Sequence, residues 1–154
     1  QDLRDKWIKA YRMKAWFDQA LKSKNEGFVT VPRSGRVRGR PSYTQSANAP
    51  FQGMSADGAK DALFLVAKEC YAVPESPLFG SRPLVFVHDE IIIEAPDEKR
   101  SEAGKRLASV MIEAMDGVTP DVPASASPAL CKSWLKGAEM VMDEETGELL
   151  VFGA

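Results

Sequence analysis

Cysteine, long apolar runs and histidine are all scarce in this sequence. Its two cysteines, Cys70 and Cys131, lie far apart and belong to no CxxC pair, so neither a disulfide framework nor a zinc site is indicated. No apolar run approaches the ~20 residues that span a bilayer, and the first residues have no signal-peptide character. These absences predict a cytoplasmic protein with no membrane partner.

His88 is the only histidine. A free-standing metal phosphohydrolase built on His88 and Asp89 is therefore a poor interpretation, because such sites need more ligands than this chain provides. With 154 residues the chain is long enough to bury a core, and we expect residues 1–154 to form a single domain. Because it opens on Gln1 rather than Met, we also expect a piece of something longer or a processed product.

Charge is distributed unevenly along the chain. The net charge of −2 argues against a wholly basic nucleic-acid coat. Residues 139–148 hold five acids and no base, whereas residues 27–41 hold no acid and four arginines: Arg33, Arg36, Arg38 and Arg40. Residues 27–41 predict a hairpin with a glycine-containing turn. Its arginines either protect a solvated edge strand or contact phosphates.

Helical and turn signals predict the remaining elements. We expect helices over residues 1–26, 50–72 and 97–116, with a loop over residues 41–50. Residues 120–154 are expected to close the fold with a terminal hairpin and an acidic tail. Together these elements predict an α+β fold in which antiparallel β-hairpins pack with three main α-helices.

The stretch that organises the chain is Leu84-Val-Phe-Val-His-Asp-Glu-Ile-Ile-Ile-Glu94, in which two apolar runs flank His88, Asp89 and Glu90. β-Branched and aromatic residues on both sides predict a buried hairpin over residues 83–95 with its charges at the tip. Carboxylates in a fixed position suit Mg²⁺, so these three residues form a candidate phosphoryl-transfer site. The alternative is a turn that simply faces solvent.

Asn48 and Gln52 lie four residues apart where the predicted loop meets the second helix, a spacing that places their side chains side by side. In one interpretation Asn48 caps the helix and Gln52 is merely exposed. In the other, the neutral amides contact the minor groove of DNA, where base-edge acceptors look alike from pair to pair. The residues alone leave both interpretations open.

Two motifs taken together resemble a known family. Asn48-Ala-Pro-Phe-Gln-Gly-Met-Ser-Ala-Asp-Gly-Ala-Lys60, followed further along by Val87-His-Asp-Glu90, is similar to the C-terminal part of the palm in family A DNA polymerases, the DNA polymerase I group, and looks most like the phage-encoded members. The Val122-Pro stretch and Trp134 resemble the family's closing segment. The resemblance covers residues 5 to 136 and implies a palm-type sheet.

This resemblance implies a role for each matching residue. Asp89 would be the motif C aspartate that helps to hold two Mg²⁺ ions, with Glu90 as a secondary ligand or support. His88 would contact the primer terminus, and Asn48 and Gln52 the minor-groove edge near the new base pair. The implied reaction is attack of the primer 3′-hydroxyl on the α-phosphate of a dNTP, with primer–template DNA as partner, in a bacterial or phage-infected cell.

The chain also departs from the family pattern. Thr44 stands where the bacterial enzymes tend to carry an arginine. The family's other catalytic aspartate and its dNTP-binding fingers helix have no counterpart, since Arg4 is followed four residues later by Ile8, and Arg12 by Trp16. We therefore expect the chain to be inactive alone and to need an N-terminal polymerase segment or chain, as in a split polymerase. The alternative is a non-catalytic, polymerase-derived DNA-binding accessory domain.

Overall fold

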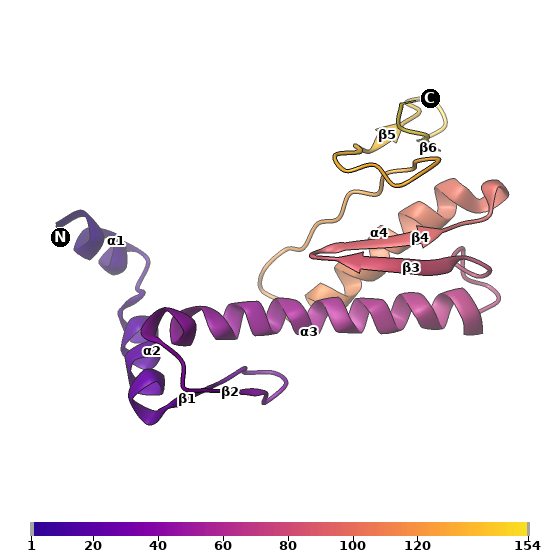
Figure 1. Ribbon diagram of the computed structural model, residues 1–154. Helices are drawn as coiled ribbons and strands as arrows, with labels where there is room; N and C mark the ends of the chain where they lie inside the picture. Colours follow the sequence, from indigo (N-terminus) through magenta and orange to yellow (C-terminus); the bar gives the residue numbers. More distant parts are fainter. Residues whose placement is uncertain (1, 154) are drawn as a thin grey trace. The chain divides into compact units, whose positions relative to one another are not determined.

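Helices and β-hairpins alternate along the chain (Figure 1). The structure, a computed structural model, describes residues 2–153. Within that range it contains four α-helices and three two-stranded antiparallel sheets, which confirms the predicted α+β fold. Contacts group the chain into two units, Gln1–Asp57 and Gly58–Ala154, which are described separately, and the expectation of a single domain stays a prediction. None of the helices in the described range has both the length and the apolar character of a membrane span.

The helix predicted over residues 1–26 is broken in the middle, and its first residue lies outside the described range. The structure has α1 over Asp2–Ala10 and α2 over Lys14–Glu26. Between them Arg12 adopts a left-handed φ of 54°, and the Met13 N–H donates to the carbonyl five residues earlier at 2.9 Å, as at a Schellman helix end. The prediction of one helix is wrong because an arginine occupies the position where glycine usually signals the stop.

The arginine-rich hairpin forms as predicted. α2 ends at Gly27, whose φ of 80° is left-handed. β1 (Phe28–Thr30) then pairs antiparallel with β2 (Val37–Gly39). Val29 in β1 is buried, whereas every residue of β2 is exposed. The hairpin is therefore attached to its unit through β1 and presents β2 to solvent.

α3 runs over Tyr43–Ala72 and begins well before the predicted start at residue 50. The Gln45 N–H donates to Ser42 Oγ at 3.2 Å, and the Ser42 N–H donates to Gln45 Oε1 at 2.9 Å. These reciprocal bonds form a capping box. The loop prediction for residues 41–50 is wrong because it was based on their polar composition. Ser42 and Gln45 instead cap a helix that continues through Pro50.

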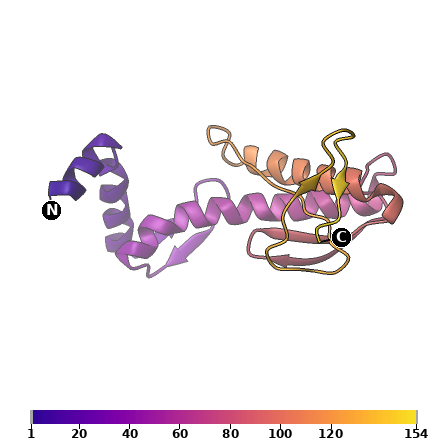
Figure 2. The same cartoon turned by 90° about the horizontal axis from the view of Figure 1, so that it is seen from above.

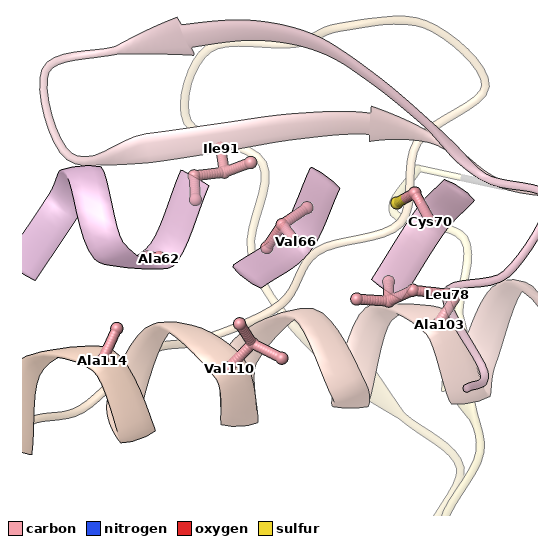
Figure 3. Packing of buried hydrophobic residues seen from close by; sticks show 8 residues of the cluster. All are labelled: Ala62, Val66, Cys70, Leu78, Ile91, Ala103, Val110 and Ala114. Atoms are coloured by element: carbon pink, nitrogen blue, oxygen red, sulfur yellow. The ribbon is translucent and has the colours of Figure 1, made fainter. Parts of the chain in front are cut away.

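A hydrophobic core in the second unit joins α3, α4 and the central hairpin. β3 (Arg82–Val87) and β4 (Glu90–Glu94) form that hairpin, and a 3-10 helix (Asp97–Lys99) leads into α4 (Arg100–Asp116). Figures 1 and 2 show the hairpin and α4 alongside the C-terminal part of α3. Figure 3 shows the buried side chains packed together: Ala62, Val66, Cys70, Leu78, Ile91, Ala103, Val110 and Ala114. This core fixes the hairpin on the two helices.

A polar network ties α3 to α4 beside this core. The Arg106 guanidinium donates to both carboxylate oxygens of Glu69, at 2.9 and 2.5 Å, and to Glu113 at 2.6 Å. Ser76 Oγ also donates to Glu69, at 2.6 Å. The hydrogen bond from Arg106, more than the others, holds the pKa of the Glu69 carboxyl below its ordinary value despite partial burial. The ionised form of Glu69 therefore stabilises the folded unit.

The predicted terminal hairpin forms and packs onto α4. β5 (Val141–Met142) and β6 (Leu149–Leu150) pair antiparallel. Leu149 is 2% exposed, and its N–H donates to Ser101 Oγ at 2.8 Å. A Cβ added at Gly104 would lie 2.8 Å from Leu149 Cδ1. The absence of a side chain at Gly104 therefore makes room for the C-terminal hairpin.

Ser42→Ala should lower the free energy of unfolding by about 1 kcal/mol, because the capping box at the start of α3 is lost. Urea denaturation followed by circular dichroism measures the change. Ser55→Ala, at an exposed serine inside the same helix, is the matched control and should change stability by less than about 0.5 kcal/mol. Equal effects of the two substitutions would contradict the capping box.

Glu69→Gln should destabilise the second unit by about 2 kcal/mol at neutral pH, because the charged hydrogen bonds to Arg106 are weakened. The pKa of Glu69 is lowered from an ordinary value of 4.5, so its contribution is present above that pH and is lost as the pH falls through the folded-state value. The gap between wild type and variant should therefore close in acid. Urea denaturation at a series of pH values from neutral into the acid range checks this. Glu98→Gln, at an exposed carboxyl, is the control, and a gap that does not change with pH would contradict the prediction.

Candidate functional site

His88 and Asp89 form the two-residue turn of the β3–β4 hairpin. Val87 pairs with Glu90 across the strands, so Glu90 is the first residue of β4 and stands beside the turn. His88, Asp89 and Glu90 are all exposed. The hairpin therefore presents the three predicted site residues together at its tip.

The turn carries backbone strain at His88. Its φ is 56°, and a positive φ at the first of two turn residues is typical of a type II′ turn, where glycine is the usual residue. A side chain in this conformation costs about 1 kcal/mol or more. Such strain persists where the surrounding structure imposes it, and it often accompanies function. Among the residues of this hairpin, His88 is therefore the one whose residue type fits its backbone conformation least well.

The core fixes the strand that follows the turn. Ile91 is 7% exposed and belongs to the buried cluster, and Figure 3 shows it reaching from the hairpin toward Val66 of α3. Phe86, which pairs with Ile91 across the hairpin, is 40% exposed. Because β4 is anchored so close to the turn, the backbone next to Asp89 has a defined position, while the Asp89 side chain is exposed.

Asp89 and Glu90 are the groups at this tip that a metal ion would use. Carboxylate oxygens are hard ligands that suit Mg²⁺, which often takes one or two protein carboxylates and completes its shell with water and phosphate oxygens. Over residues 2–153, no group of three or more His, Cys, Asp or Glu side chains is placed to hold a metal ion. The tip therefore offers two exposed carboxylates of the kind that Mg²⁺ prefers.

The other predicted residues lie in the first unit. Asn48 and Gln52 are exposed in the N-terminal part of α3, and a spacing of four residues puts them on one face of the helix. Asn48 is not the helix cap, because Ser42 holds that position. The capping interpretation of Asn48 is therefore excluded, and both amides face solvent.

The four arginines of the hairpin do not share one environment. Arg38 lies in β2 with its side chain exposed, and Arg33 and Arg40 are exposed on either side of that strand. Arg36 instead turns back onto α3, where its Nη2 donates to Asp57 Oδ1 at 2.5 Å. All four side chains are therefore at the surface, and that of Arg36, 43% exposed, is also bonded to a buried carboxylate of α3.

No role was predicted for Asp57, which is 7% exposed. Its Oδ2 has no hydrogen-bond partner among the described residues, so the bond from Arg36 is what offsets the burial of the carboxylate. The available signal was the spacing of Ala49, Gly53 and Asp57 at intervals of four residues. This spacing puts an acid in line with small side chains on one helix face.

Comparison with known proteins places this chain among polymerases. Residues 12–136 match the family model described as DNA polymerase family A. The chain is 33% identical over 142 residues to the thermostable DNA polymerase I of Thermus aquaticus, and 30% identical over 144 residues to DNA polymerase I of Bacillus subtilis (strain 168). It is 27% identical over 154 residues to the thermostable DNA polymerase I of Thermus thermophilus. No solved structure matches it.

These alignments cover most of this chain but a small part of each relative. They span 83%, 84% and 88% of the chain, against 16%, 16% and 17% of the proteins from T. aquaticus, B. subtilis and T. thermophilus respectively. The family match takes in the arginine hairpin, α3 and the β3–β4 hairpin, so every predicted site residue lies inside it. The hairpin of β5 and β6 lies beyond it.

His88→Gly should raise the free energy of unfolding by about 1 kcal/mol, because glycine adopts a positive φ without strain. His88→Ala keeps the unfavourable conformation and should not stabilise the hairpin. Chemical denaturation of both variants beside the wild type measures the difference. If the two substitutions changed stability equally, His88 would not be the strained position of the turn.

Proposed function

This chain belongs to DNA polymerase family A, and we propose that it forms the C-terminal part of the palm of a DNA-directed DNA polymerase. In that role it supplies the motif C aspartate for nucleotidyl transfer onto a primer 3′-hydroxyl, together with contacts to the primer–template duplex. The observation that carries the proposal is the exposed His88–Asp89 turn with Glu90 beside it, on a hairpin anchored in the core.

Asp89 is the residue that we assign to metal binding, with Glu90 as a second ligand or a support. Both carboxylates are exposed at the hairpin tip, where water and phosphate oxygens can reach a shared ion. The chemistry that two bound Mg²⁺ ions supply is activation of the primer hydroxyl and stabilisation of the leaving pyrophosphate. Because Ile91 anchors β4, Asp89 is held ready for this role before substrate binds.

His88 is proposed to contact the primer terminus, because it shares the turn with Asp89. Asn48 and Gln52 are proposed to donate hydrogen bonds to base-edge acceptors in the minor groove, which all correct base pairs present. Neutral amides can then test the geometry of a pair without reading its sequence. Arg38, exposed on β2, is proposed to contact the phosphate backbone.

Exposed apolar side chains support a contact between the second unit and another part of the polymerase. Phe64 on α3 is 69% exposed, and Leu84 and Val85 on β3 are 58% and 48% exposed. Apolar surface of this kind often marks an interface. We infer that the covering segment carries the other catalytic aspartate and the fingers helix that binds the dNTP, on the same polypeptide or on a separate chain. The 154 residues alone should then be inactive, and a phage origin stays a prediction.

Native mass spectrometry of the protein from its own source, followed by primer extension with Mg²⁺, tests this proposal. We expect the missing segment to be present in the same species, and extension to occur only when it is bound or attached. A lone chain with neither a partner nor extension would contradict the catalytic role. A non-catalytic DNA-binding accessory domain would then describe the protein better.

Asp89→Ala should lower primer extension by the assembled polymerase by a factor of about 10³ or more, because a metal ligand is lost. DNA affinity should stay the same or rise, because a negative charge is removed. Extension assays and fluorescence anisotropy with one duplex separate the two effects. Asp116→Ala, at an exposed carboxylate at the end of α4, is the control and should preserve both. Primer extension by the Asp89 variant at the wild-type rate would contradict the catalytic assignment of Asp89.

A further inference from the structure

Arg36 connects the β1–β2 hairpin to α3, the helix that carries Asn48 and Gln52. Its Nη2 donates to Asp57 Oδ1 at 2.5 Å and to the Gly53 carbonyl at 2.9 Å, and its Nε donates to Ser34 Oγ at 3.2 Å. Gly53 and Asp57 both belong to α3, and all of these residues lie in the first unit. The guanidinium therefore bridges the turn of the hairpin and one turn of the helix.

A second contact holds the hairpin at the same turn of α3. Val31, the residue after β1, is 8% exposed and packs on Gly53. A Cβ added at Gly53 would lie 2.7 Å from Cγ1 of Val31 and closer still to Cγ2, so only glycine permits this approach. Gly53 directly follows Gln52, and the hairpin is therefore anchored next to one of the two amides.

Asp57 makes this attachment sensitive to the loss of Arg36. Its carboxylate is almost completely buried, and its second oxygen has no hydrogen-bond partner within residues 2–153. Removing the partner of a buried charge destabilises a protein far more than the intact pair stabilises it. The orientation of the hairpin therefore depends on the Arg36–Asp57 pair as well as on the contact between Val31 and Gly53.

We propose that the Arg36–Asp57 pair positions the hairpin for DNA binding. The pair holds the exposed Arg38 at a fixed place relative to Asn48 and Gln52, so that phosphate and minor-groove contacts form on the same duplex. Arg36 is then a positioning residue and not one of the phosphate contacts. This inference rests on the proposed DNA-binding function, and it separates the arginine that orients the hairpin from those that touch DNA.

Electrostatic attraction and positioning predict opposite effects of removing the Asp57 charge. Asp57→Asn makes the chain more positive, so simple attraction to phosphate predicts tighter DNA binding. Loss of the charged pair with Arg36 instead loosens the hairpin, which predicts weaker binding. The direction of the change therefore distinguishes the two explanations.

Fluorescence anisotropy with a labelled primer–template duplex, over a series of salt concentrations, measures binding by the chain and its variants. We expect Asp57→Asn to bind roughly tenfold more weakly than the wild type. Arg36→Lys keeps the charge but loses the forked donation of the guanidinium, and it should weaken binding similarly. Arg100→Lys, at an exposed arginine of α4, is the matched exchange and should bind like the wild type. Arg38→Gln should instead weaken binding and reduce the salt slope by about 0.9.

Hydrogen exchange gives a readout that needs no DNA. Amides of residues 28–39 should exchange faster in Asp57→Asn, whereas amides of β4 in the second unit should keep their protection. Unchanged exchange in the hairpin, or binding as tight as the wild type or tighter, would overturn the positioning role and leave the proposed function intact. A wild-type chain that binds no duplex would instead overturn the proposed function, and the exchange result would still decide whether the pair holds the hairpin.

Discussion

Close packing of small side chains between α3 and α4 is the constraint on which the second unit depends. Ala62 and Ala103 are 3% and 0% exposed, and they share a cluster with the branched side chains of Val66 and Val110. Because protein interiors are packed as densely as organic crystals, a larger side chain at either alanine would force the helices apart. Ile91 of the central hairpin enters the same cluster (Figure 3), so the position of the hairpin tip follows from this packing.

In each unit, an ion pair to an acid of α3 accompanies the apolar packing. Arg106 bonds to Glu69 in the second unit, and Arg36 bonds to Asp57 in the first. Both acids belong to α3. Apolar contacts are non-directional, whereas a charged hydrogen bond to a buried or partly buried acid has a narrow range of acceptable geometry. The apolar contacts therefore hold the elements together, and the ion pairs select one orientation of the element that covers α3.

The parts of the fold that were predictable are those whose signals are local. The central hairpin follows from apolar runs on either side of His88 and Asp89, and the end of α2 follows from Gly27. The start of α3 was missed because residues 41–50 are polar, which is typical of a loop, whereas Ser42 and Gln45 form a capping box there. The capping box is itself a local signal, so the earlier start was readable from Ser42 and Gln45.

By itself, the sequence determined the order of helices and hairpins, the gathering of His88 and Asp89 at one turn, and the likeness to a polymerase family. Propensities, caps and turns are set by residues within a few positions of one another. Only the tertiary structure decided that Arg36 bonds to Asp57 while Arg38 lies in the exposed strand β2. The two arginines look equivalent in the sequence, and the difference arises because a buried carboxylate, Asp57, must have a charged partner and only one of them reaches it.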